Sequence, residues 1–307
     1  MLTSDSFDAL KNKQSVLTIG SFDGVHIGHQ KIIKHLVSVA HKKGLQSVVL
    51  TFFPHPRMVL NSNDDIKLLN TLEEKSKLLE SFGVDHLIVL PFTKEFSNQS
   101  ASDYVKHVLV DGLRVAHLVV GYDHHFGKNR EANVDNLITY GSKYHFEVEQ
   151  IDAQDVELIT VSSSKIRKAI ESGKVSLASQ YLGYYYHLKG TVVHGKAIGR
   201  QIGFPTANIQ LESHLKLVPK NGVYAIRTLF CGVNYDGMMN IGNNPTVSGQ
   251  GVNIEVHFFD FDRDLYGQTI EIDCIARLRD EHKFDSLEAL AMQLIDDKTT
   301  ALKMLKK

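Results

Sequence analysis

The sequence predicts two parts in one chain: an α/β domain, followed by a mainly antiparallel β-barrel with a C-terminal helix. The chain has 307 residues, of which 43% are hydrophobic, and this is longer than one hydrophobic core usually serves. In the first half, short apolar runs alternate with helical patterns. From Leu188 onward, strand-like runs follow one another with turns between them. This change of pattern predicts the change of fold.

Four buried strands and several helices are expected in the first half. A helical pattern starts at about His29, with Ile33 and Leu36 on one face. Thr71 and Glu74 form a capping box before a second helix, and a third is expected around residues 104–109. Such alternation predicts a Rossmann-like parallel sheet with helices on both faces. The expected strands are residues 16–19, 48–53, 87–90 and 118–120.

The second half is expected to form a small barrel. Its strand-like runs are rich in β-branched and aromatic residues, and glycine and asparagine lie between them. A helix starting near Ser162 comes before this part, so the boundary is placed near Gly183, with domains 1–183 and 184–307. The expected strands are residues 190–193, 223–226, 254–258 and 270–272.

A C-terminal helix is expected to follow the barrel. Asp285 is the predicted cap, with Glu288 three residues later. The apolar residues of this helix are expected to pack on the barrel. They are Leu287, Leu290, Leu294 and Ile295.

Composition narrows the partners and the location. The 34 Lys and Arg residues are balanced by 35 Asp and Glu residues, so no nucleic acid partner is expected. No apolar run is long enough to span a membrane, so no membrane partner is expected. The first residues lack the features of a signal peptide, and Cys231 and Cys274 are the two cysteines. A reducing cytoplasm is therefore the expected location.

A glycine-rich turn at residues 20–29 predicts a phosphate site. Gly20, Gly24 and Gly28 allow backbone N–H groups to approach an anion where a strand gives way to a helix. His26 and His29 come at the helix entrance, where imidazoles can bind a phosphate. Two alternatives stay open: ordinary surface histidines beside a tight turn, or a metal site that includes His55, His124 and His125.

A second phosphate motif is expected where the helix near Ser162 begins. The hydroxyls of Ser163 and Ser164 and the free N–H groups of a helix start can share one anion pocket. Arg167 adds a charged fork for a pyrophosphate. The alternative is a serine cap followed by a surface arginine.

A third motif, at residues 195–208, predicts a separate site. Thr206 and Asn208 offer two hard oxygen ligands of the kind that Mg²⁺ binds together with substrate phosphates. The alternative is a proline-containing turn that leads into a strand. The glycines of the same motif could wrap phosphates, and Arg200 and Pro205 lie among them. These glycines are Gly195, Gly199 and Gly203.

These motifs resemble those of the bacterial bifunctional riboflavin kinase/FMN adenylyltransferase family. Residues 20–29 are similar to the H-x-G-H pattern of nucleotidyltransferases, with Ser163, Ser164 and Arg167 as the second pattern. Residues 51–56 and 121–127 resemble the flavin-adenylating branch, except that His124 stands where the family usually has Phe. The resemblance implies that His26, His29 and Arg167 are catalytic and that Asp123 and Phe53 position the flavin or the nucleotide. The other implied ATP-binding residues are Gly20, Phe22, Asp23, Gly24, Gly28, Ser163 and Ser164.

The third motif resembles the riboflavin kinase pattern, as do residues 240–246, 255–261 and 264–267. The resemblance implies that Glu255 is the general base, and that Thr206 and Asn208 hold Mg²⁺ with ATP. Lys196 replaces a common acidic residue in the loop. The alternative is that Glu255 is an outward-facing strand residue without a catalytic role.

The implied function is flavin cofactor synthesis, with riboflavin, FMN, FAD and ATP as partners and Mg²⁺ as cofactor. One part would phosphorylate riboflavin, and the other would adenylylate the FMN. Two rivals stay open. One is a chain with a single active part. The other is a flavin-sensing binding protein, which would have no need of a base such as Glu255.

Overall fold

The computed structural model describes residues 1–60, 66–121, 124–151, 161–195, 198–242 and 252–306. The chain forms two compact units, Met1–Ser162 and Ser163–Lys307. This division comes before a helical hairpin, whereas the sequence places a boundary after that hairpin, near Gly183. Among the described helices, none is both long and apolar enough to span a membrane.

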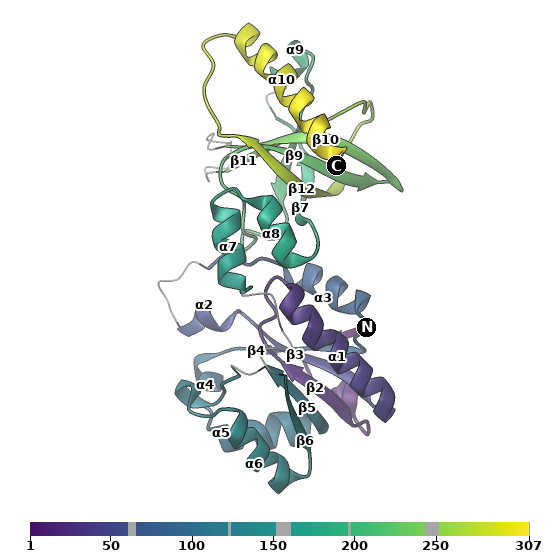
Figure 1. Cartoon of the computed structure of the whole chain (residues 1–307), viewed down its shortest axis with the longest axis vertical. Coiled ribbons are helices and arrows are strands. Elements are labelled where there is room, and N and C mark those ends of the chain that lie inside the picture. The colour runs from purple at the N-terminus through teal and green to yellow at the C-terminus, as the bar shows by residue number, and fades with distance from the viewer. Residues whose placement is uncertain (61–65, 122–123, 152–160, 196–197, 243–251, 307) are drawn as a thin grey trace. The chain divides into compact units, whose positions relative to one another are not determined.

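The first unit contains a parallel sheet of six strands in the order β1-β4-β3-β2-β5-β6 (Figure 1). The four predicted strands are the inner ones, and the predicted parallel α/β fold is confirmed. The edge strands β1 and β6 were not predicted, because they are short and only partly buried. The strands are β1 (Leu2–Ser4), β2 (Ser15–Ile19), β3 (Gln46–Phe53), β4 (His86–Pro91), β5 (Val115–Gly121) and β6 (Glu147–Ile151).

Helical segments cover both faces of this sheet. On one face, α1 (Ile27–Lys43) and α3 (Leu72–Ser81) pack on Val16, Val49 and Leu87. Their sequence neighbours Leu17, Val48 and Ile88 face the opposite side, because side chains alternate along a strand. A π-helical segment, Tyr104–Gly112, and α6 (Val134–Tyr144) cover that side. The shorter helical segments are Asp8–Leu10, α2 (Pro56–Leu60), α4 (Lys94–Ser97), α5 (Ala101–Asp103) and Lys128–Arg130.

The second unit is a closed antiparallel barrel in the order β10-β11-β8-β7-β12-β9. The four predicted barrel strands are present. Two strands, β8 and β10, were not predicted, because buried and exposed residues do not alternate regularly along either of them. The strands are β7 (Tyr186–Val193), β8 (Ala207–Leu211), β9 (Gly222–Phe230), β10 (Val233–Gly242), β11 (Asn253–Phe258) and β12 (Thr269–Arg279).

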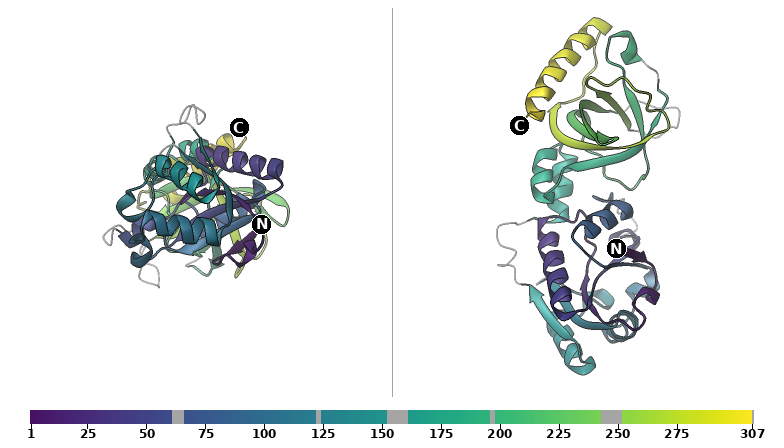
Figure 2. Two further views of the ribbon diagram at one scale, coloured as in Figure 1. Left: turned by 90° about the horizontal axis from the view of Figure 1, so that it is seen from below. Right: turned by 90° about the vertical axis from the view of Figure 1, so that its right-hand side faces the viewer.

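Four helices accompany the barrel. The predicted helix near Ser162 is α7 (Ser163–Glu171), and α8 (Val175–Leu182) follows it. The short α9 (Ile198–Gln201) precedes β8, and α10 (Leu287–Leu305) runs along the outside of the barrel (Figure 2).

Two predictions about α10 are wrong. The cap is Ser286, whose Oγ accepts the Ala289 N–H at 3.1 Å, and not Asp285. Leu287 and Ile295 are 45% and 57% exposed, so they do not pack on the barrel. Leu294 packs on the barrel as predicted, together with Ala301 and Leu305.

A buried charge explains the error in the face of α10. Asp297 is 3% exposed and lies on the packed face, where its carboxylate accepts two hydrogen bonds from the Arg279 guanidinium, Nε to Oδ1 at 2.9 Å and Nη2 to Oδ2 at 2.8 Å. A prediction from apolar residues alone does not include such a position in the packed face, because an aspartate is rarely buried without a partner and the partner is not visible in the local sequence.

Candidate functional sites

The predicted phosphate turn follows β2 and has an unusual backbone. Phe22 and Val25 have φ angles of 43° and 33°, which bulky and β-branched residues rarely adopt. Two side chains donate to the carbonyl of Ser21: Lys75 Nζ at 2.7 Å and Thr51 Oγ1 at 3.3 Å. These bonds hold the turn in a conformation that its own residues disfavour.

His26 and His29 are brought together where α1 begins. His26 is the N-cap, and its Nδ1 accepts the His29 backbone N–H at 3.3 Å. The two rings stack, with centroids 3.6 Å apart and an interplanar angle of 14°. Because Nδ1 accepts a hydrogen bond, we assign the proton of neutral His26 to Nε2, which is then a donor for a ligand.

Both histidines are neutral at neutral pH. Burial lowers the pKa of His26 to about 4, although the nearby Asp23 carboxylate opposes this shift. Burial and the neighbouring His26 and Lys75 hold the pKa of His29 well below its usual value. The Nδ1 atom of His29 is sealed from solvent and has no hydrogen-bond partner among the described residues. The pair can therefore offer hydrogen bonds to a phosphate, but no positive charge.

Asp23 and Lys75 are buried beneath the turn. Asp23 is 1% exposed, and its Oδ1 accepts the backbone N–H groups of Leu69 at 2.9 Å and Asn70 at 3.4 Å. Lys75 is 8% exposed, and burial lowers its pKa while Asp23 partly opposes this. The sequence analysis missed Lys75. The available signal was a lysine on the apolar face of α3, three residues after Leu72.

A row of aromatic rings was also missed. It lies where β3, β4 and β5 end, and it joins Phe52 to Phe96, Phe96 to Tyr104 and Tyr104 to Phe126, with centroids 5.4, 6.0 and 5.8 Å apart. Tyr104 and Phe126 belong to the core of the unit, whereas Phe52 and Phe96 are only partly buried, at the edge where parallel sheets bind ligands. Phe53, which the sequence singled out, is 39% exposed and has no ring contact in this row.

Three further expectations concern this site. Asp123 lies outside the described residues. Ser163, Ser164 and Arg167 lie on α7 of the second unit, so their meeting with His26 stays a prediction. Within the described part of the chain, no group of three His, Cys, Asp or Glu side chains could hold a metal ion.

The third motif comes together on the barrel. Asn208 on β8 is the register partner of Glu255 on β11. Thr206 Oγ1 donates to Glu255 Oε2 at 3.5 Å, and Asn253 Nδ2 donates to Glu255 Oε1 at 2.6 Å. A Cβ atom on Gly195 would lie 1.9 Å from Asn208 Nδ2, so the loop approaches Asn208 as closely as glycine allows.

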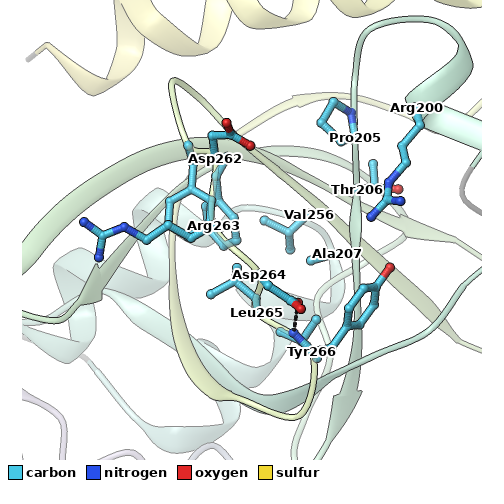
Figure 3. A pocket seen from close by; sticks show the side chains of 13 residues that line it. Arg200, Pro205, Thr206, Ala207, Val256, Asp262, Arg263, Asp264, Leu265 and Tyr266 are labelled. Atoms are coloured by element: carbon cyan, nitrogen blue, oxygen red, sulfur yellow. Dashed lines mark hydrogen bonds between the residues drawn. The ribbon is translucent and has the colours of Figure 1, made fainter.

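A cavity of about 510 Å³ opens beside these residues (Figure 3). Arg200 and Thr206 lie on one side of it, and Asp262 and Arg263 lie on the other. Val256 and Phe258 give it an apolar floor. The cavity therefore combines an apolar surface with the Thr206 hydroxyl and charged side chains in its wall, which suits a ligand with both an aromatic and a hydroxylated part.

The sequence analysis also missed part of this cavity's wall. Tyr266 lines the cavity, and its ring stacks on His194 with centroids 3.9 Å apart. Asp264 Oδ1 accepts the Tyr266 N–H at 2.9 Å and holds the loop in place.

Comparison with known proteins gives a family for each unit. Residues 8–165 match the FAD synthetase family, and residues 182–305 match the riboflavin kinase family. The bifunctional riboflavin kinase/FMN adenylyltransferase of Listeria monocytogenes is 43% identical over 284 residues, which is 92% of this chain and 90% of the relative. The protein of the same description from Bacillus subtilis is 38% identical, over 94% and 92% of the two chains.

A solved structure has the same fold along its length. A Streptococcus pneumoniae protein described as a macrolide-efflux protein matches with a TM-score of 0.87 and 30% identity, over 98% of both chains.

Proposed function

This chain belongs to the bifunctional riboflavin kinase/FMN adenylyltransferase family, and we propose how its residues divide the two reactions. The chain phosphorylates riboflavin to FMN with ATP. It then transfers AMP from a second ATP to FMN, which gives FAD and pyrophosphate. Kinase chemistry belongs to the barrel and adenylyl transfer to the α/β unit, as the two matched families indicate.

In the kinase reaction, we propose Glu255 as the general base. The terminal ribityl hydroxyl of riboflavin attacks the γ-phosphorus of ATP, the bond to ADP breaks, and Glu255 accepts the hydroxyl proton. The observation that supports this most directly is the convergence of Glu255 with Thr206, which also lines the cavity, and with Asn208, its register partner.

The same cluster fits Mg²⁺. The Thr206 hydroxyl and the Asn208 amide oxygen are hard, uncharged ligands, and the close approach of Gly195 leaves the Asn208 side chain little room to turn away. Bound with ATP, Mg²⁺ would neutralise charge on the phosphates. Gly199, Arg200, Gly203 and Pro205 would shape the loop around them.

In the adenylyl transfer, we propose that the FMN phosphate attacks the α-phosphorus of ATP directly, with pyrophosphate as the leaving group. His26 donates from Nε2 to a phosphate oxygen, and His29 lies stacked against it. Arg167 would add the positive charge that the neutral histidines lack, with Ser163 and Ser164 beside it. The partly buried rings of Phe52 and Phe96 would stack on the flavin.

We also propose that the chain works in the cytoplasm. Its two cysteines are unpaired in the structure, and Cys231 is exposed. A reducing compartment would keep that thiol intact.

Two substitutions test the division of labour. Glu255→Gln keeps the size of the side chain but removes the proton acceptor, so riboflavin phosphorylation should fall about a hundred- to ten-thousand-fold. FAD formation from supplied FMN should stay near the parent rate. His29→Ala should do the reverse, with roughly a hundredfold loss of FAD formation.

Both products are measured by chromatography after incubation with riboflavin or FMN and Mg·ATP. A Glu255→Gln chain that makes FMN at the parent rate would show that Glu255 is an ordinary strand residue. If the unsubstituted chain makes only one of the two products, the hypothesis of a single active part is supported. If it makes neither product, the hypothesis of a flavin-sensing binding protein is supported.

A further inference from the structure

Lys75 is a buried charge that the proposed reaction does not yet use. It lies on α3, and its side chain passes under the turn after β2, where its ammonium donates to the Ser21 carbonyl at 2.7 Å. Burying a charged amine is costly unless it is paired or hydrogen-bonded. A lysine held at this cost beside the proposed phosphate turn calls for a role.

The turn needs external support. Phe22 and Val25 occupy left-handed backbone conformations that are rare and energetically costly for such side chains. Three side chains hold the turn from outside: Lys75 and Thr51 at the Ser21 carbonyl, and Gln30 Nε2 at the Val25 carbonyl at 2.9 Å. Of these three, Lys75 makes the shortest bond and has the only charged group.

The position of the histidine pair depends on the same turn. His26 follows Val25 directly and caps α1, and Phe22 packs edge-on against the His29 ring at 5.1 Å. A shift of the Ser21 carbonyl therefore moves both the backbone N–H groups of the turn and the two imidazoles.

We propose that Lys75 is a positioning residue for adenylyl transfer: its ammonium holds the Ser21 carbonyl, and so it sets the turn and His26 in the geometry that receives the transferred phosphate. Its ammonium interacts with the Asp23 carboxylate of the turn, while both histidines are neutral. The inference rests on the proposed role of the turn in the first unit.

The test is Lys75→Met in the full chain, with Lys77→Met as the matched control. Methionine keeps the volume and the unbranched shape but loses the donor and the charge. Lys77 is on the same helix, but its side chain is 57% exposed and pairs with Glu73. Rates of FAD formation from FMN, KM for ATP and riboflavin phosphorylation are measured for both variants.

Lys75→Met should lower kcat for FAD formation about a hundredfold, because a misplaced phosphate turn loses contacts made in the transition state. KM for ATP should change less than about threefold, and riboflavin phosphorylation should stay at the parent rate. Lys77→Met should leave all three unchanged. A general loss of structure would instead raise KM and lower the unfolding temperature of the chain in proportion.

A folded Lys75→Met chain with kcat within twofold of the parent overturns the proposal. If His29→Ala still abolishes FAD formation, the proposed site stands and only the role of Lys75 falls. If Lys75→Met does not fold, Lys75→Gln decides the matter, because its amide is polar but uncharged and one bond shorter than the lysine side chain, so it cannot hold the Ser21 carbonyl where the ammonium does. A tenfold lower kcat for Lys75→Gln supports the proposal, and a parent rate overturns it.

Discussion

Burial determines how the two histidines of the first unit can work. A protonated imidazole would attract a phosphate by charge, but the pKa of His26 is lowered to about 4 and that of His29 lies well below its usual value. Neutral His26 still has one N–H donor, because its Nδ1 accepts the His29 N–H and its proton is on Nε2. The positive charge for the phosphates therefore comes from groups other than this histidine pair.

The lowered pKa of His26 predicts a pH-dependent stability. Between pH 6.5 and about 4, the unfolded chain takes up a proton that the folded chain refuses, so stability present above pH 6.5 is lost as the pH falls. The loss approaches about 3 kcal/mol for a shift of this size. Denaturant unfolding between pH 7.5 and 4.5 should show it. His26→Asn should reduce the dependence, since asparagine also caps helices but does not titrate. The part that remains belongs to His29, whose pKa is also lowered.

The matched control is His41→Asn, on the exposed side of the same helix. It should leave the pH dependence as in the parent. An unchanged slope in His26→Asn would place the titrating group elsewhere.

At the scale of elements, α10 is attached to the barrel by polar as well as apolar contacts. Arg279 at the end of β12 binds Asp297, and Arg227 on β9 donates to the Leu305 carbonyl at 3.1 Å. Leu294, Ala301 and Leu305 fill the space between these bonds. The helix is thus fixed at its middle and at its end, while its first turn depends on its cap.

That first turn supplies a test of the cap. Ser286→Ala should lower the free energy of unfolding of the second unit by about 1 kcal/mol, because the Ala289 N–H loses its acceptor. Asp285→Ala is the control and should change it by less than about 0.5 kcal/mol. Thermal unfolding measures both. A larger effect for Asp285→Ala would mean that Asp285 caps the helix in solution.

At the scale of the whole molecule, the α7–α8 hairpin is built into the barrel unit. Lys220 N–H donates to the Ile170 carbonyl at 3.2 Å, and Ser176 Oγ donates to the Ile275 carbonyl at 2.9 Å. Arg277 runs past Gly173 so closely that a Cβ atom there would lie 2.5 Å from its Cδ. The hairpin that carries Ser163 and Arg167 thus packs with the kinase fold.

Fragments test the proposed boundary near Gly183. We expect 163–307 and 184–307 both to unfold cooperatively and to phosphorylate riboflavin. The longer one should have a midpoint several degrees higher, because it keeps the hairpin contacts. Equal midpoints would show that the hairpin adds no stability. A shorter fragment that does not fold would place the boundary before α7.

The sequence by itself determined both fold classes and the positions of the inner strands along the chain, and it singled out three motifs as phosphate sites. These depend on local features: the period of apolar residues, glycine in turns and short patterns such as residues 20–29. It also placed Thr206, Asn208 and Glu255 in one motif set. Their contact in the structure follows from the pairing of β8 with β11.

Only the tertiary structure decided what depends on burial and distant pairing. The edge strands β1 and β6 and the barrel strand β10 exist because neighbours supply their hydrogen bonds. The packed face of α10 contains Asp297 because Arg279 meets it there. Lys75 and the neutral histidines acquire their roles from surroundings contributed by separate segments. The period of apolar residues indicates which face of a helix or strand is buried, because neighbouring residues determine it. The protonation state and the hydrogen-bond partners of a buried polar side chain depend on residues far away along the chain.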